Sequence, residues 1–179
     1  MEQRKKSDLN QRSVKSLLKH HANDILNSQH FVNSKNHIQH GTMSVHDHSL
    51  NVAKMSLKIS RKLPFSVRER ELVRGALLHD YFQYDWHGKK ISLQTILRFY
   101  KMHGFTHAKS ALSNAEKEYP LTRRERDIIE KHMFPLNIHP PRCKEAWIVT
   151  IADKYCSILE TIHIHKGEHY GKHHGKPSR

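Results

Sequence analysis

A histidine and an aspartate stand side by side at the end of an apolar segment, where Gly75–Leu78 is followed by His79 and Asp80. Burying an ionised carboxylate beside an imidazole costs free energy unless a partner or a metal ion compensates. Neighbouring residues on a helix point about 100° apart, so both side chains can reach one ion lying off the end of a helix. The pair therefore predicts a metal site.

Further ligands are expected from the inward faces of other helices. His48 shares one helical stripe with Val52 and Ile59, and Asp153 follows Ala152 in an apolar segment. Each residue taken alone is more often a hydrogen-bonded core or surface residue than a ligand. Four interior-facing residues of these types together favour a site for a borderline or hard divalent ion.

These residues also carry a resemblance to a known family. The order His, His-Asp, Asp occurs in the segments HDHSLNVA, GALLHDYF and TIADKYCSILE. Over residues 37–162 the chain resembles the HD superfamily of metal-dependent phosphohydrolases. Three sequence segments resemble those of small stand-alone bacterial HD proteins: HDYFQYDWH, KHMFPL and ADKYCSILE.

The resemblance implies a metal site at the centre of an all-helical fold. In one subset of the superfamily two more histidines hold a second metal, and His107 and His132 stand at the matching places. Asp80 is then the natural bridge between the two ions. The implied ligand set is His48, His79, Asp80, His107, His132 and Asp153. Fe or Mn is favoured, and Co, Ni, Zn and Mg are also compatible.

The implied activity is hydrolysis of a phosphate ester or anhydride, in a nucleotide, a cyclic nucleotide or another phosphorylated small molecule. A divalent ion lowers the pKa of bound water and takes up charge on phosphoryl oxygens. Asp80 and Lys154 are the candidate catalytic residues, although Lys154 could equally be a surface lysine. His40, Asp85 and His87 are candidate substrate-binding residues; the alternative for the last two is an ordinary polar loop.

Most of the 18 histidines are bystanders. His46 lies two residues before His48, about 200° around a helix, so it cannot share the same metal. Several others fall in or near the C-terminal segment, His163, His165, His169, His173 and His174. Metal binding there would be adventitious, because ordering a flexible tail costs conformational entropy.

Apolar periodicity predicts the all-α class, and the resemblance implies a single HD-domain helical bundle with a buried metal centre. Residues 1–165 form the domain, with an N-terminal helix over 12–27, and residues 166–179 form a basic, His-rich disordered tail. The other expected helices cover residues 43–62, 67–82, 92–102, 107–118, a segment after Thr122, and 143–164. Residues 28–42 are expected to be a loop. Capping boxes are expected at Ser66 with Glu69 and at Thr122 with Glu125.

Composition limits the remaining function classes. The formal charge of +14 attracts phosphates, so the alternative is a basic nucleic-acid-binding or scaffold protein with a structural metal and no turnover. Its aromatic residues are scattered through apolar helices, which does not favour a base-stacking surface. No apolar run is long enough for a membrane span, and no signal-peptide pattern is found. A cytoplasmic protein with two free cysteines is expected, and its oligomeric state is left open.

Overall fold

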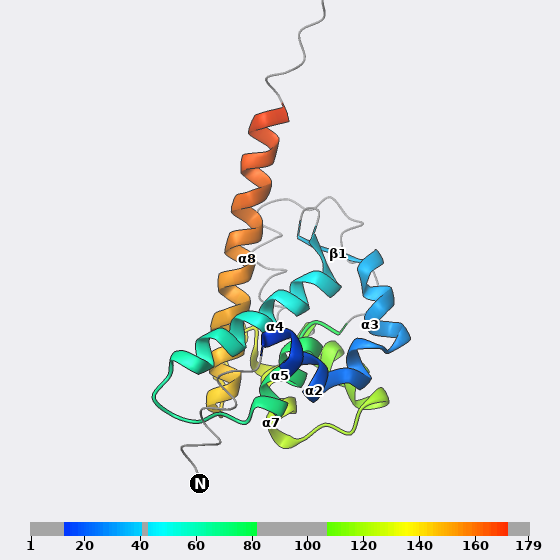
Figure 1. Cartoon of the computed structure of the whole chain (residues 1–179), viewed down its shortest axis with the longest axis vertical. Coiled ribbons are helices and arrows are strands. Elements are labelled where there is room, and N and C mark those ends of the chain that lie inside the picture. Colours follow the sequence, from blue (N-terminus) through cyan, green and yellow to red (C-terminus); the bar gives the residue numbers. More distant parts are fainter. Residues whose placement is uncertain (1–12, 41–42, 82–106, 172–179) are drawn as a thin grey trace, which may run out of the picture.

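The computed structural model describes residues 13–40, 43–81 and 107–171, and only the backbone of residues 38–40 and 163–171. Within them the predicted all-α class is confirmed. The helices are α2 (Val14–Leu26), α3 (Gln29–Asn33), α4 (Val45–Lys62), α5 (Glu69–Leu78), a helix over residues 107–118, α7 (Arg123–Lys131) and α8 (Lys144–Gly171) (Figure 1). The strands in the described part are β1 (Ile38–His40) and β2 (Met43–Ser44), which pair antiparallel.

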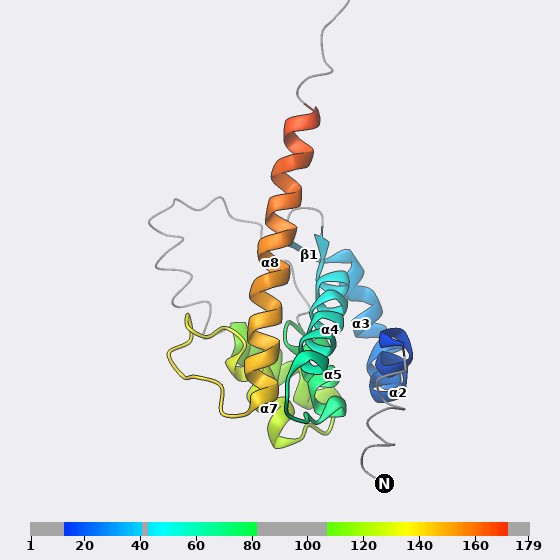
Figure 2. The same ribbon diagram turned by 60° about the vertical axis from the view of Figure 1, so that its left-hand side comes forward.

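Four helices surround the centre of the domain. The helix α5 packs against α4, α7 and α2, and α8 packs against α4 and α7. Figure 2 shows α8 and α4 running side by side, with α8 extending past the other helices. Buried side chains such as Val52, Leu77, Ile129 and Val149 fill the space between these helices. The N-terminal helix α2 packs on this bundle through Leu17 and Ile25, which are among the residues of the same core.

The close crossing of α5 and α7 depends on a glycine. A Cβ added to Gly75 would lie 2.5 Å from Cδ1 of Ile128 and 2.9 Å from its Cβ. No larger residue fits at that crossing without displacing a helix, because the interior is close-packed. This contact brings the end of α7 next to the end of α5, where His79 and Asp80 lie.

Helix starts were predicted with mixed success. The capping box of Thr122 and Glu125 at the start of α7 is confirmed by both of its hydrogen bonds. The capping box predicted at Ser66 is wrong, since α5 begins at Glu69 and Arg68 is its N-cap. The Arg68 backbone N–H instead donates to the buried carboxylate of Glu145 on α8 at 2.9 Å. A distant acid therefore accepts from the N-cap N–H, which is the role that the predicted capping box gave to Glu69.

Two further predictions differ from the structure, the loop over residues 28–42 and the end of the last helix. The expected loop over residues 28–42 contains α3, a 3-10 turn (Ser34–Asn36) and β1. Ser28 caps α3, and Phe31 anchors it in the core. The last helix runs to Gly171 instead of 164. The predicted helix over 92–102 and the tail residues 172–179 lie outside the described residues. No described helix is long and apolar enough to cross a membrane.

Candidate metal centre

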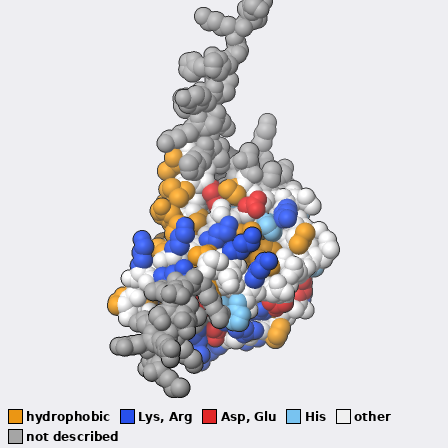
Figure 3. Space-filling view, viewed as in Figure 1, with side chains coloured by type: hydrophobic (Ala, Val, Ile, Leu, Met, Phe, Trp, Pro, Cys, Tyr) orange, Lys and Arg blue, Asp and Glu red, His pale blue; other side chains and the backbone are white. Residues whose placement is uncertain are grey.

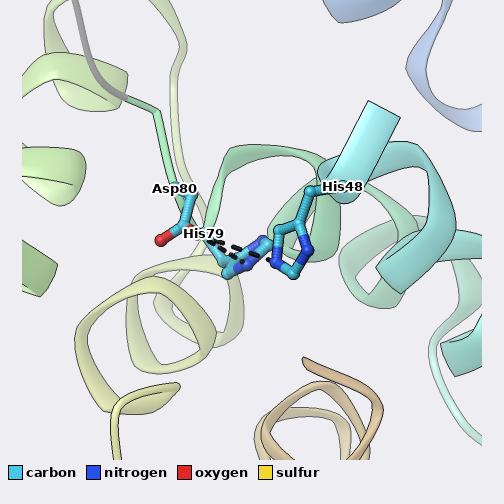
Figure 4. Close-up of side chains that lie close together, drawn as sticks. All are labelled: His48, His79 and Asp80. Carbon is cyan, nitrogen blue, oxygen red and sulfur yellow. Dashed lines mark ion pairs between the residues drawn. The ribbon is translucent and has the colours of Figure 1, made fainter. Parts of the chain in front are cut away.

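Five structural elements direct the predicted ligands to one buried point. His48 comes from the first turn of α4, His79 and Asp80 follow the last turn of α5, and Asp153 lies on α8. His132 follows α7, and His107 begins the helix over residues 107–118. Figure 4 shows the His48 and His79 rings converging near the carboxylate of Asp80. Five of the six are at most 5% exposed, and the His107 side chain is 18% exposed.

The first group consists of His48, His79 and Asp80, whose ligand atoms lie within 4.8 Å of one another. Oδ2 of Asp80 is 3.3 Å from Nε2 of His79 and 3.8 Å from Nε2 of His48. Asp153 closes this group from α8, since its Oδ1 lies 3.2 Å from Nε2 of His48 and 3.7 Å from that of His79. Two imidazole nitrogens and two carboxylate oxygens therefore face a common space.

The second group consists of Asp80, His107 and His132, again within 4.8 Å. Here the other oxygen of Asp80 takes part. Its Oδ1 lies 2.9 Å from Nε2 of His107 and 3.3 Å from Nε2 of His132. Asp80 thus turns one oxygen toward each histidine pair, which is the geometry of a bridging carboxylate.

Backbone hydrogen bonds set the histidine tautomers. The Nδ1–H of His79 donates to the carbonyl of Ala76 at 2.7 Å, and that of His132 donates to the carbonyl of Ile129 at 2.8 Å. A carbonyl can only accept, so Nδ1 carries the proton and Nε2 of the neutral ring keeps its lone pair. Such bonds are typical of metal-ligating histidines.

The buried Nε2 atoms of His79 and His132 show whether these residues suit a bound metal ion. Neither has a hydrogen-bond partner among the described residues, although each lies 3.3 Å from an oxygen of Asp80. A buried polar atom left unsatisfied costs roughly 1–3 kcal/mol. A divalent ion in each group would take up one of these lone pairs, so the donor sets fit metal ions.

Glu160 on α8 supports the first group from behind and was not predicted from the sequence. Its Oε2 lies 2.8 Å from Nδ1 of His48, and its Oε1 accepts from Asn51 at 3.5 Å. The residue is 7% exposed. It could have been found, because it lies two helical turns after Asp153, on the same face of α8. A carboxylate behind a ligating histidine fixes the ring and makes Nε2 a stronger donor.

The carboxylates give the centre an affinity for positive charge. Burial alone would lower the pKa of His48, but hydrogen bonds to Asp153 and Glu160 outweigh it and raise the pKa to about 9. Burial likewise opposes a charged His79, yet Asp80 and Asp153 raise its pKa to about 10. Although burial favours the neutral acid, the adjacent imidazoles hold the pKa of Asp80 well below its usual range. The site therefore retains cations, protons included.

The other predicted residues are placed less centrally. Lys154 lies at the rim, with Nζ 2.9 Å from Oδ2 of Asp153 and 3.3 Å from the carbonyl of His132. His46 points elsewhere, as expected, and contacts Asp47 and the ring of Phe31. The backbone of His40 belongs to β1, but its side chain is outside the described set, as are residues 85 and 87.

Comparison with protein families agrees with the geometry. The HD domain matches residues 45–158, more than half of the chain and a span that contains all six candidate ligands. The chain belongs to the HD domain family. Membership places it in a superfamily of metal-dependent phosphohydrolases and confirms the resemblance noted in the sequence. Comparison with curated proteins and with solved structures finds no match. Glu160 lies outside the span matched to the HD domain.

Proposed function

We propose that this HD domain is a dinuclear, metal-dependent phosphohydrolase that cleaves a phosphate ester or anhydride, in a nucleotide or cyclic nucleotide. The observation that carries the proposal is the divided carboxylate of Asp80. One oxygen faces His48 and His79, and the other faces His107 and His132. A second ion would account for the convergence of the His107 and His132 Nε2 atoms on Oδ1 of Asp80, at 2.9 and 3.3 Å.

The chain's own residues have separate tasks in this proposal. His48, His79, Asp80 and Asp153 hold the first ion, and Asp80, His107 and His132 hold the second. Divalent ions at such a site supply an activated water and neutralise charge on the phosphoryl oxygens. Iron or manganese suits the mixed imidazole and carboxylate ligands. The backbone-bonded rings of His79 and His132 are preorganised, so little reordering is needed when the ions bind.

Lys154 is the residue proposed to meet the substrate. Its side chain is 38% exposed at the rim while Nζ contacts the ligand Asp153. An ammonium in this position can attract an anionic phosphate toward the centre and also hold the second oxygen of Asp153 in place. His40, Asp85 and His87 stay as predicted substrate contacts.

The test combines turnover with metal content. The protein is stripped with a chelator, reloaded with manganese or iron, and assayed against nucleotides, cyclic nucleotides and simple phosphate esters. Activity should vanish on stripping and return on reloading. Equal turnover by verified metal-free protein would refute the proposal.

Variants separate two ions from one. His132→Ala should lower the metal content from about two per chain to about one and reduce kcat/KM by roughly 10²–10³. His20→Ala is the matched control, because His20 is an exposed histidine on α2, a helix that carries none of the six candidate ligands. A wild type that holds one ion, unchanged in His132→Ala, would reduce the centre to the four residues around His48.

A further inference from the structure

One face of α8 carries a row of large apolar side chains that are exposed, here called the α8 stripe. Its members are between 38% and 58% exposed: Trp147, Ile151, Tyr155, Ile158, Leu159 and Ile162. Figure 3 shows hydrophobic side chains gathered along the edge of the molecule where α8 runs. Elsewhere in the described part, large apolar side chains this exposed are Val32, Phe65 and Ile138, which lie apart on other segments. The exposed apolar surface is thus concentrated on one helix.

The opposite face of α8 is already used by the domain. Ala152, Asp153 and Cys156 are buried on that side, which packs against α4 and α7 and contributes to the metal centre. A surface helix normally turns a polar face to water, and a helix that is apolar on all sides is normally covered on all sides. Among residues 146–162, the charged or hydroxyl-bearing aliphatic side chains with comparable exposure are those of Thr161 and, at 38%, Lys154. The α8 stripe therefore has the character of a surface that another protein surface covers.

The spacing of the stripe indicates what covers it. Ile151, Tyr155, Ile158 and Ile162 follow one another at intervals of four, three and four residues. That alternation forms a straight seam along a helix and is the pattern by which two helices pair side by side. A seam of this kind complements an identical seam related by a two-fold axis. We propose that the protein forms a homodimer in which the α8 stripes of two copies pack together.

The area is adequate for such a dimer. From their exposed fractions, the six side chains present on the order of 600 Å² per copy, so pairing buries on the order of 1,200 Å² in total, the lower end of stable interfaces. Exposed apolar patches of this size on a monomer mark interaction sites.

A membrane is a less suitable occupant than a second copy. Helices that lie on membranes combine an apolar face with a polar face rich in Lys and Arg that stays in water. The other face of α8 is instead buried in the domain and holds Asp153. The inference does not depend on catalysis, so it can fail or succeed independently of the proposed activity.

The test is the mass of the full-length, metal-loaded protein in solution. Sedimentation or light scattering over a wide range of micromolar concentrations should give twice the 21.1 kDa mass of the chain. The double variant Ile151→Glu/Ile158→Glu should be monomeric, with an unchanged helical circular dichroism spectrum and unchanged metal content. Ile138→Glu is the control, since Ile138 is 74% exposed away from the stripe, and it should remain dimeric.

Several results would overturn the dimer. One is a wild-type protein that stays monomeric at every concentration. Another is a double variant that still dimerises, which would place the interface elsewhere. A monomer that binds vesicles of phosphatidylcholine and phosphatidylserine through the α8 stripe would assign the surface to a membrane. A monomer that the double substitution unfolds would assign the stripe to contacts within the chain.

Discussion

Replacing Glu160 by glutamine should weaken metal binding at the first group of ligands and leave the fold intact. The carboxylate lies 2.8 Å from Nδ1 of His48, and the residue is 7% exposed. Glutamine has nearly the same shape and can still accept the hydrogen bond from His48. It lacks the negative charge that strengthens Nε2 as a donor, and its amide must be accommodated by Asn51, which now donates to Oε1. The substitution therefore changes charge more than packing.

The expected magnitude follows from this geometry. Loss of a carboxylate behind a ligating histidine costs about 10–100-fold in metal affinity, which is about 1.4–2.7 kcal/mol. A value near the upper end is expected, because the bond is short and buried, and hydrogen bonds to charged groups are about twice as strong as neutral ones. The second group should be less affected, since Glu160 has no contact with His107 or His132 among its hydrogen bonds and ion pairs.

The assay is a titration of stripped protein with manganese or zinc in competition with a chromophoric chelator. Glu116→Gln is the control, because it makes the same chemical change on an exposed side chain that pairs with Arg126. Only the Glu160 variant should show one weakened site per chain. Equal affinities in the wild type and both variants, or an equal loss in both variants, would show that Glu160 does not tune the metal.

Three further predictions follow from the same structure. The pKa values of His48 and His79, about 9 and 10 without metal, mean that binding expels protons. Metal affinity should therefore rise as pH increases toward these values, with proton release measurable by calorimetry in buffers of different ionisation enthalpy; affinity independent of pH would contradict this. Gly75→Ala should destabilise the fold by about 1–3 kcal/mol because of Ile128, and an unchanged urea midpoint would count against the close crossing. Truncation after Lys166 should preserve fold, metal content and activity, and loss of metal from the shortened chain would show that the C-terminal residues contribute.

Much of the centre could be predicted from the sequence, because helical periodicity, capping motifs and the His-Asp motif each involve residues that are close together in the chain. Helical periodicity indicated most helices, and Thr122 with Glu125 formed the expected capping box. The placement of His79 and Asp80 after an apolar helix indicated a buried site before any contact was known. The match to the HD domain confirms the family that these motifs resemble.

Only the tertiary structure decided which residues from distant parts of the chain contact one another. Asp80 could be named as a bridge, but the direction of each of its oxygens depends on four helices packing together. The start of α5 was likewise decided by a distant residue, because the buried carboxylate of Glu145 on α8 accepts a hydrogen bond from the N–H of the N-cap residue Arg68.

Which face of α8 is buried and which is exposed was also decided only by the tertiary structure. Apolar residues occur on every side of α8. The sequence therefore does not distinguish a core residue such as Val149 from an exposed one such as Ile151. Which face is buried depends on where α4 and α7 pack, and that is a property of the whole chain. Local pattern specifies that a helix forms, whereas burial follows from contacts between residues far apart in sequence.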